Sequence, residues 1–124
     1  MKIRIKGNTI RYRLTRTEVT ELCTTGSVTE TTNFSTNIFN YAIKKSSLKS
    51  ITANFTNNTI TVQVPESMIT NWDTNAIISL ENIINLEDNV TLSILIEKDF
   101  TCLDERGEDE SDNYPNPLAV KKNG

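Results

Sequence analysis

Apolar and polar residues alternate along much of this chain, a pattern typical of strands that bury only one face of a sheet. The clearest example is the stretch "SITANFTNNTITVQV", residues 50–64, in which Asn57 and Asn58 supply a two-residue turn. The apolar side chains on both sides of this turn share one face, and the polar side chains share the other. The pattern predicts an antiparallel hairpin with one dry and one wet face.

A second hairpin is predicted in the stretch "KIRIKGNTIRYRL", residues 2–14, where Gly7 and Asn8 form a favoured two-residue turn. The register of such a hairpin places opposite one another Ile5 and Ile10, Arg4 and Arg11, Ile3 and Tyr12, and Lys2 and Arg13. One face of the hairpin is therefore apolar. The other, which we name the cationic face, carries Lys2, Arg4, Arg11 and Arg13, with Lys6 at its turn end.

The residues that follow this hairpin carry the signals of a helix. Thr15 is a good N-cap, Glu18 completes a capping box, and Gly26 is a suitable stop. A second, short helix is predicted in "ESMITNW", residues 66–72, where Pro65 ends the preceding strand. In both segments the apolar residues have helical spacing, so we expect them to pack in the core.

Further strands are predicted at residues 27–32, 38–43, 76–85 and 91–100, which gives about eight strands in hairpin order with two short helices. This content predicts a mainly β (β-rich α+β) protein, built as one antiparallel domain that forms a curved sheet, a sandwich or a small barrel. No internal repeat is expected. We place the domain at residues 1–103 and an acidic, proline-containing segment, partly docked on it, at residues 104–124.

Charge is strongly polarised along the chain, although the net charge is only -3. The first sixteen residues hold six cations and no acid, whereas the segment 97–112 holds eight acids and two cations. Like charges directly opposite one another destabilise a strand pair, so the cationic face requires a negative counterpart. The acidic partners expected within the chain are Glu97, Asp99, Asp104 and Glu105.

Three kinds of counterpart are consistent with the sequence. The chain's own acidic segment can pair with the cationic face, because guanidinium groups bind carboxylates in fork geometry. Alternatively, the arginines hold phosphate or carboxylate groups of a small ligand, or face a protein partner. Nucleic acid is disfavoured, because the cationic strip is short and the pI of about 5.0 opposes binding to a polyanion.

The chain contains no histidine, which excludes Ser-His-Asp and Cys-His catalysis within it. No catalytic motif, metal site or cofactor is expected, so a non-enzymatic binding or interaction module is favoured. The alternative is a metal-dependent enzyme that acts on a phosphorylated small molecule. With two cysteines, Cys23 and Cys102, no signal peptide and no membrane span, the chain is expected to be cytoplasmic and without a membrane partner.

Both ends of the chain resemble a known group of proteins. "MKIRIKGNTIRYRLTRTEV" and "LSILIEKDFTCLDERGEDESDNYPNP" are similar to a family of small bacterial proteins of unassigned function, found largely among Bacteroidetes-type bacteria. The resemblance implies a bacterial protein whose acidic segment belongs to the module. It implies no reaction, ligand or catalytic residue.

Overall fold

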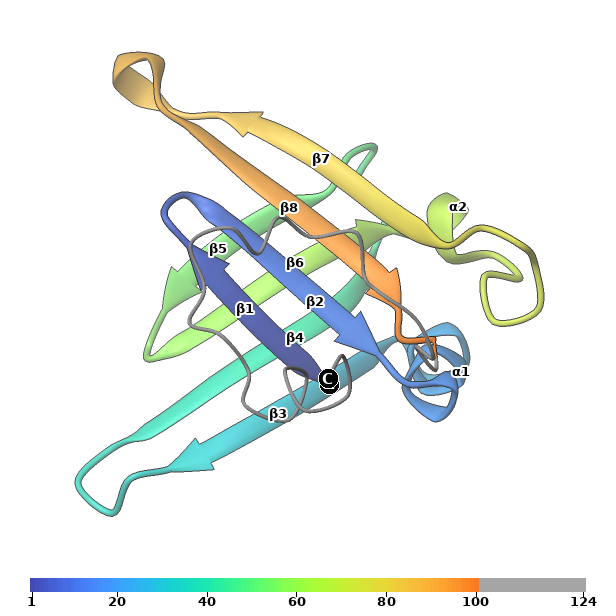
Figure 1. The fold of residues 1–124 in the computed structure, drawn as a ribbon, viewed down its shortest axis with the longest axis horizontal. Coiled ribbons are helices and arrows are strands. Elements are labelled where there is room, and N and C mark those ends of the chain that lie inside the picture. Colours follow the sequence, from blue (N-terminus) through green and yellow to red (C-terminus); the bar gives the residue numbers. More distant parts are fainter. Residues whose placement is uncertain (101–124) are drawn as a thin grey trace, which may run out of the picture.

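The computed structural model describes residues 1–100, which fold into two β-sheets and two helices (Figure 1). The elements run in the order β1 (Lys2–Lys6), β2 (Thr9–Leu14), α1 (Arg16–Thr25), β3 (Ser27–Asn33), β4 (Ile38–Ser46), β5 (Thr52–Thr56), β6 (Thr59–Pro65), α2 (Glu66–Ile69), β7 (Ser79–Asn85), the 3-10 turn η1 (Glu87–Asn89) and β8 (Thr91–Lys98). The predicted β-rich α+β class is confirmed, with eight strands among these residues. The two sheets are not closed into a barrel.

Each sheet consists of two hairpins joined side by side. Sheet A has the strand order β1-β2-β8-β7 and sheet B the order β3-β4-β6-β5. The expected hairpin order accounts for the four antiparallel pairings, but the central pairs β2–β8 and β4–β6 are parallel. The alternation of apolar and polar residues predicts each hairpin, but it does not predict which hairpins pair with one another in a sheet. Each parallel pair joins the edge of one hairpin to the edge of another hairpin of the chain.

The two hairpins predicted from sequence have the predicted register. Arg4 lies opposite Arg11 and Lys2 opposite Arg13 in the first hairpin, whereas Phe55 lies opposite Ile60 in the second. The first turn uses Gly7 at a positive φ of 54°, and the second uses Asn57 and Asn58 at 54° and 58°. Glycine and asparagine adopt left-handed backbone at the lowest energetic cost. The positions of both turns could therefore be predicted from residue type.

The signals at both ends of α1 are also confirmed. The Thr15 hydroxyl accepts a hydrogen bond from the Glu18 amide, and the Glu18 carboxylate accepts one from the Thr15 amide at 2.8 Å. At the other end Gly26 adopts φ 89° and its N–H donates to the carbonyl of Leu22. The reciprocal cap satisfies two donors that the first turn of a helix leaves without partners.

The expectation of a chain without internal repeat is corrected by the topology. A unit of hairpin, helix and hairpin occurs twice, first as β1-β2-α1-β3-β4 and then as β5-β6-α2-β7-β8. The stretch "NTIRYRLTRTEV" that begins at Asn8 recurs as "NTITVQVPESMI" from Asn58. Each sheet takes the first hairpin of one unit and the second hairpin of the other, so that the units exchange hairpins.

Buried residues occupy equivalent places in the two units. The equivalent core pairs in the first hairpins and in the helices with the turn that follows α2 are Ile10 and Ile60, Tyr12 and Val62, Leu14 and Val64, Val19 and Ile69, and Leu22 and Trp72. All of them belong to one hydrophobic cluster. The repeat is weak in the sequence because apolar character is kept at these positions while most residue identities are not.

The two ends of the sandwich differ. Both helices lie at one end, and the turns of all four hairpins lie at the opposite end (Figure 1). No helix within residues 1–100 is long and apolar enough to span a membrane. The predicted segment 104–124, the boundary at residue 103 and Cys102 lie outside the described residues.

Removal of the α1 N-cap tests the contribution of this reciprocal bonding. Thr15→Ala should lower the free energy of unfolding by about 1 kcal/mol, since the Glu18 amide loses its acceptor. Thr17→Ala, an exposed substitution within the same helix, serves as the control and should change stability much less. Urea denaturation followed by circular dichroism measures both, and equal losses would contradict the assigned role of Thr15.

Candidate functional site

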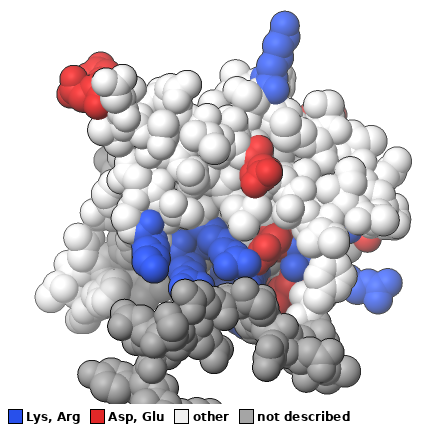
Figure 2. Space-filling model, turned by 45° about the horizontal axis from the view of Figure 1, so that its top comes forward, with Lys and Arg blue, Asp and Glu red and all other residues white. Residues whose placement is uncertain are grey.

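The cationic face lies on the outer surface of sheet A, over β1 and β2. In β2, Ile10, Tyr12 and Leu14 are buried against the other sheet, so the alternate residues Arg11 and Arg13 face outward. The pairing of β1 with β2 then sets Arg4 beside Arg11. Figure 2 shows lysine and arginine side chains gathered in a strip on this side of the molecule, with acidic side chains next to it.

Glu97 lies at the centre of the contacts described for this face. The parallel pairing of β2 with β8 places it beside Arg13. The Nε atoms of Arg11 and Arg13 both donate to the same Glu97 oxygen, Oε1, at 2.8 and 2.7 Å. The Glu97 side chain is only 15% exposed, so two cations share one largely buried carboxylate.

The end of β8 supplies a second carboxylate. Lys2 forms an ion pair with Asp99 at 3.4 Å, and the Asp99 backbone N–H donates to the carbonyl of Leu14 at 2.9 Å. The structure thus brings Lys2, Arg11 and Arg13 together with two of the acidic residues singled out in the sequence. The other two, Asp104 and Glu105, lie outside the described residues.

The environment of Glu97 favours its charged form. Partial burial alone would raise the pKa of the Glu97 carboxyl, but the hydrogen bonds from Arg13 and Arg11 outweigh it, and the pKa is lowered from its ordinary value of 4.5. The carboxylate therefore remains ionised at neutral pH and holds both guanidinium groups in place. Their terminal nitrogens remain as additional donor groups, because each bond to Glu97 uses Nε.

Two depressions in the surface are lined by the cations themselves. One of about 210 Å³ is bounded by Lys2, Ile3, Arg4, Arg11 and Arg13. The other, of about 270 Å³, is bounded by Arg4, Lys6, Thr9 and Arg11. Neither has an acidic residue in its wall. Both are therefore places where an anionic group can meet several donors at once.

Sheet B provides an internal comparison for this face. The pairing registers match Lys2 with Thr52, Arg4 with Asn54, Lys6 with Thr56, Arg11 with Thr61 and Arg13 with Gln63. The five cations of the β1–β2 hairpin thus have neutral polar residues at the equivalent places of the β5–β6 hairpin. Because the same hairpin is built there without positive charge, the hairpin itself does not require the cationic face.

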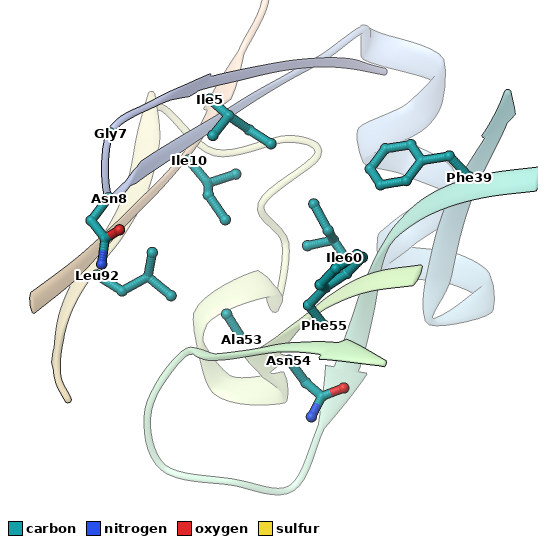
Figure 3. Close-up of a pocket in the computed structure, with 10 residues that line it drawn as sticks. All are labelled: Ile5, Gly7, Asn8, Ile10, Phe39, Ala53, Asn54, Phe55, Ile60 and Leu92. Carbon is teal, nitrogen blue, oxygen red and sulfur yellow. The ribbon is translucent and has the colours of Figure 1, made fainter. Parts of the chain in front are cut away.

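A different site, missed in the sequence, lies between the two sheets near the hairpin turns. It is a pocket of about 400 Å³ whose wall is apolar apart from Gly7, Asn8 and Asn54 (Figure 3). The apolar lining residues are Ile5, Ile10, Phe39, Ala53, Phe55, Ile60 and Leu92. The only sequence signal was the presence of large apolar residues next to two turns, which alternation assigns to the core.

Cys23 and potential metal ligands complete the chemistry of the described residues. Cys23 is half-buried against the core and its thiol donates to the carbonyl of Ile69 at 3.2 Å. Residues 1–100 contain no group of three or more histidine, cysteine, aspartate or glutamate side chains that could hold a metal ion.

Comparison with known families gives one result. A family model described as a family of unknown function, DUF7009, matches residues 1–118. The chain belongs to this family. The match supports the family resemblance inferred from the two ends, and it extends through the central hairpins. Comparisons with curated proteins and with solved structures found no match.

Glu97→Gln tests the shared carboxylate. At neutral pH the substitution should reduce the free energy of unfolding by about 1–3 kcal/mol, because two guanidinium groups lose a charged acceptor. The lowered pKa means that this stabilisation is complete above pH 4.5 and is lost as pH falls through the pKa of the folded state. The difference between wild type and variant should therefore shrink on acidification below that value.

Glu81→Gln is the matched control, because Glu81 is an exposed glutamate on the neighbouring strand β7 for which the described residues provide no ion pair. Thermal unfolding from pH 3 to pH 7 measures all three proteins. If the two variants were equally stable across this range, Glu97 would have no special role in holding the arginines.

Proposed function

We propose that the protein is a non-enzymatic binding module whose cationic face holds an anionic partner. The partner carries carboxylate or phosphate groups, which match the geometry of guanidinium donors. No observation among the described residues favours the alternative of a metal-dependent enzyme, and we do not propose it.

The observation that carries this proposal is the comparison between the two sheets. Five cations of sheet A correspond to neutral residues in the same scaffold of sheet B. The hairpin can therefore form without these charges, although Glu97 stabilises Arg11 and Arg13 once they are present. A charged surface that the hairpin itself does not require supports the proposal of a ligand that uses it.

The local balance of charge supports the same conclusion. Glu97 and Asp99 are the acidic residues whose ion pairs with this face are described, and Glu97 is shared by two arginines. Lys6 has no ion pair within residues 1–100 and lines one of the depressions. Among residues 1–100 the five cations of this face outnumber these two carboxylates, and such an excess of positive charge attracts anions at low ionic strength.

The chain's own acidic segment is a competitor for this site in the proposal. Residues 104–112 follow soon after Asp99, which lies beside Lys2, and they include six acidic side chains. A tethered acidic segment acts at a high effective concentration, so it reduces the affinity for a free anion without forming an enzyme site. An anionic partner then binds by displacing it.

Calorimetric titration of the full chain with tripolyphosphate and with citrate tests the binding role. We expect binding that weakens with added salt, and a loss of about tenfold or more in Arg4→Asn with Lys6→Thr, since charged contacts are removed. The replacements are the residues found at the equivalent sites Asn54 and Thr56. The variant is therefore expected to fold, because the same hairpin forms with these residues in sheet B.

Lys44→Thr with Lys45→Asn is the matched control. It removes the same amount of charge from exposed positions of β4 in sheet B, and binding should be nearly unchanged. Equal weakening in both double variants would show that only net charge matters, which contradicts a site on the cationic face. Absence of heat with either anion, confirmed by an unchanged melting temperature, would contradict the binding role itself.

Neutralisation of the acidic segment tests the competition. A full-length variant with amide residues at positions 104, 105, 108, 109, 110 and 112 should bind tripolyphosphate more tightly than wild type, because the competitor has lost its charge. The gain should be largest at low salt. An unchanged affinity would exclude the segment as a competitor.

A further inference from the structure

The pocket between the sheets has the size and chemistry of a small-molecule site. Its volume of about 400 Å³ lies in the range of ligand pockets, and its wall contains no ionisable residue. The helices lie at the opposite end of the sandwich, whereas Gly7 and Asn8 of the first hairpin turn belong to the pocket wall (Figures 1 and 3). An occupant must therefore bury an uncharged, apolar part.

Two residues of the wall are exposed although they are large and apolar. Ile5 is 54% exposed and Phe55 is 67% exposed, and they occupy equivalent positions in β1 and β5. Exposed apolar side chains that converge on a concave surface are typical of a binding site. Here they border the pocket from opposite sheets (Figure 3).

The wall is built by both units of the repeat. Ile10 of the first unit is equivalent to Ile60 of the second, and Phe39 is equivalent to Leu92. The pocket thus follows from the exchange of hairpins between units. It is a feature of how the scaffold is assembled and does not come from an irregular loop.

The β1–β2 hairpin separates this pocket from the cationic face. Ile5 and Gly7 line the pocket, while Lys6, the residue between them, lines the cationic depression on the other side of the hairpin. The two sites therefore meet at the turn formed by Gly7 and Asn8. One ligand with an apolar chain and an anionic head can use both.

We propose that the pocket takes the alkyl chain of an anionic amphiphile whose head group binds at Lys6, at the turn end of the cationic face. The proposal rests on the proposed function for the head group, and it adds the apolar site and the class of ligand. The alkyl chain of the ligand is held by burial of apolar surface. A negative head group is favoured over a neutral or positive one by the positive charge of Lys6 beside the turn.

Methyl NMR spectroscopy of the full chain, labelled in isoleucine, tests the site directly. Decanoate, 1-decanol and decyltrimethylammonium have the same chain and differ in head charge. We expect decanoate to shift the methyl signals of Ile5, Ile10 and Ile60 and to leave those of Ile43 and Ile96, which lie in the core outside the pocket wall. Decanoate should bind about tenfold more tightly than the cationic probe.

Substitutions separate the two parts of the site. Ala53→Phe fills the pocket and should abolish binding of decanoate and decanol, whereas Ala76→Phe, the same change at an exposed position outside this wall, should not. Phe55→Thr, at an exposed position, weakens both ligands even if Ala53→Phe fails to fold. Lys6→Thr should weaken decanoate about tenfold and leave decanol unchanged.

Several outcomes overturn the inference. They are an absence of pocket methyl shifts with decanoate, equal affinity for all three probes, and methyl shifts that follow protein concentration as in dimerisation. If decanoate does not bind in the pocket while tripolyphosphate still binds to the protein, the amphiphile proposal is wrong and the proposed function stands. If tripolyphosphate does not bind while decanol fills the pocket, the role proposed for the cationic face is wrong and the head-group assignment is wrong with it.

Discussion

The structure depends on the burial of the apolar faces of its hairpins against one another. A single hairpin has one dry face and is unstable alone, because that face has no cover. Here four hairpins join in pairs and the resulting sheets pack face to face, so that the buried side chains of both repeat units form one cluster. The parallel central pairings and the polar outer faces both follow from this arrangement.

The same arrangement creates the candidate site. Glu97 lies far from Arg11 and Arg13 in the sequence, and only the parallel pairing of β2 with β8 brings their side chains into contact. Once the sheet is formed, Glu97 holds the arginines on one surface. The equivalent places of the β5–β6 hairpin carry neutral residues, so the hairpin itself forms without this charge.

The first hairpin connects the two proposed binding sites. Its inward residues contribute to the apolar pocket and its outward residues form the cationic face, since side chains alternate along a strand. A ligand with both apolar and anionic parts would thus contact both sides of one hairpin. The remaining scaffold holds this hairpin in position, chiefly through β8 on one side and the opposite sheet below.

The local features of the fold were predictable from the sequence. The turns at Gly7 and at Asn57, the cap at Thr15 and the outward direction of Arg11 depend on neighbouring residues alone, so alternation and turn chemistry determine them. The exchange of hairpins, the contact of Glu97 with two arginines and the pocket between the sheets were decided by the tertiary structure. They depend on which distant strands become neighbours. The alternation of apolar and polar residues in a strand does not specify this, because the strand can pack against any other that offers an apolar face.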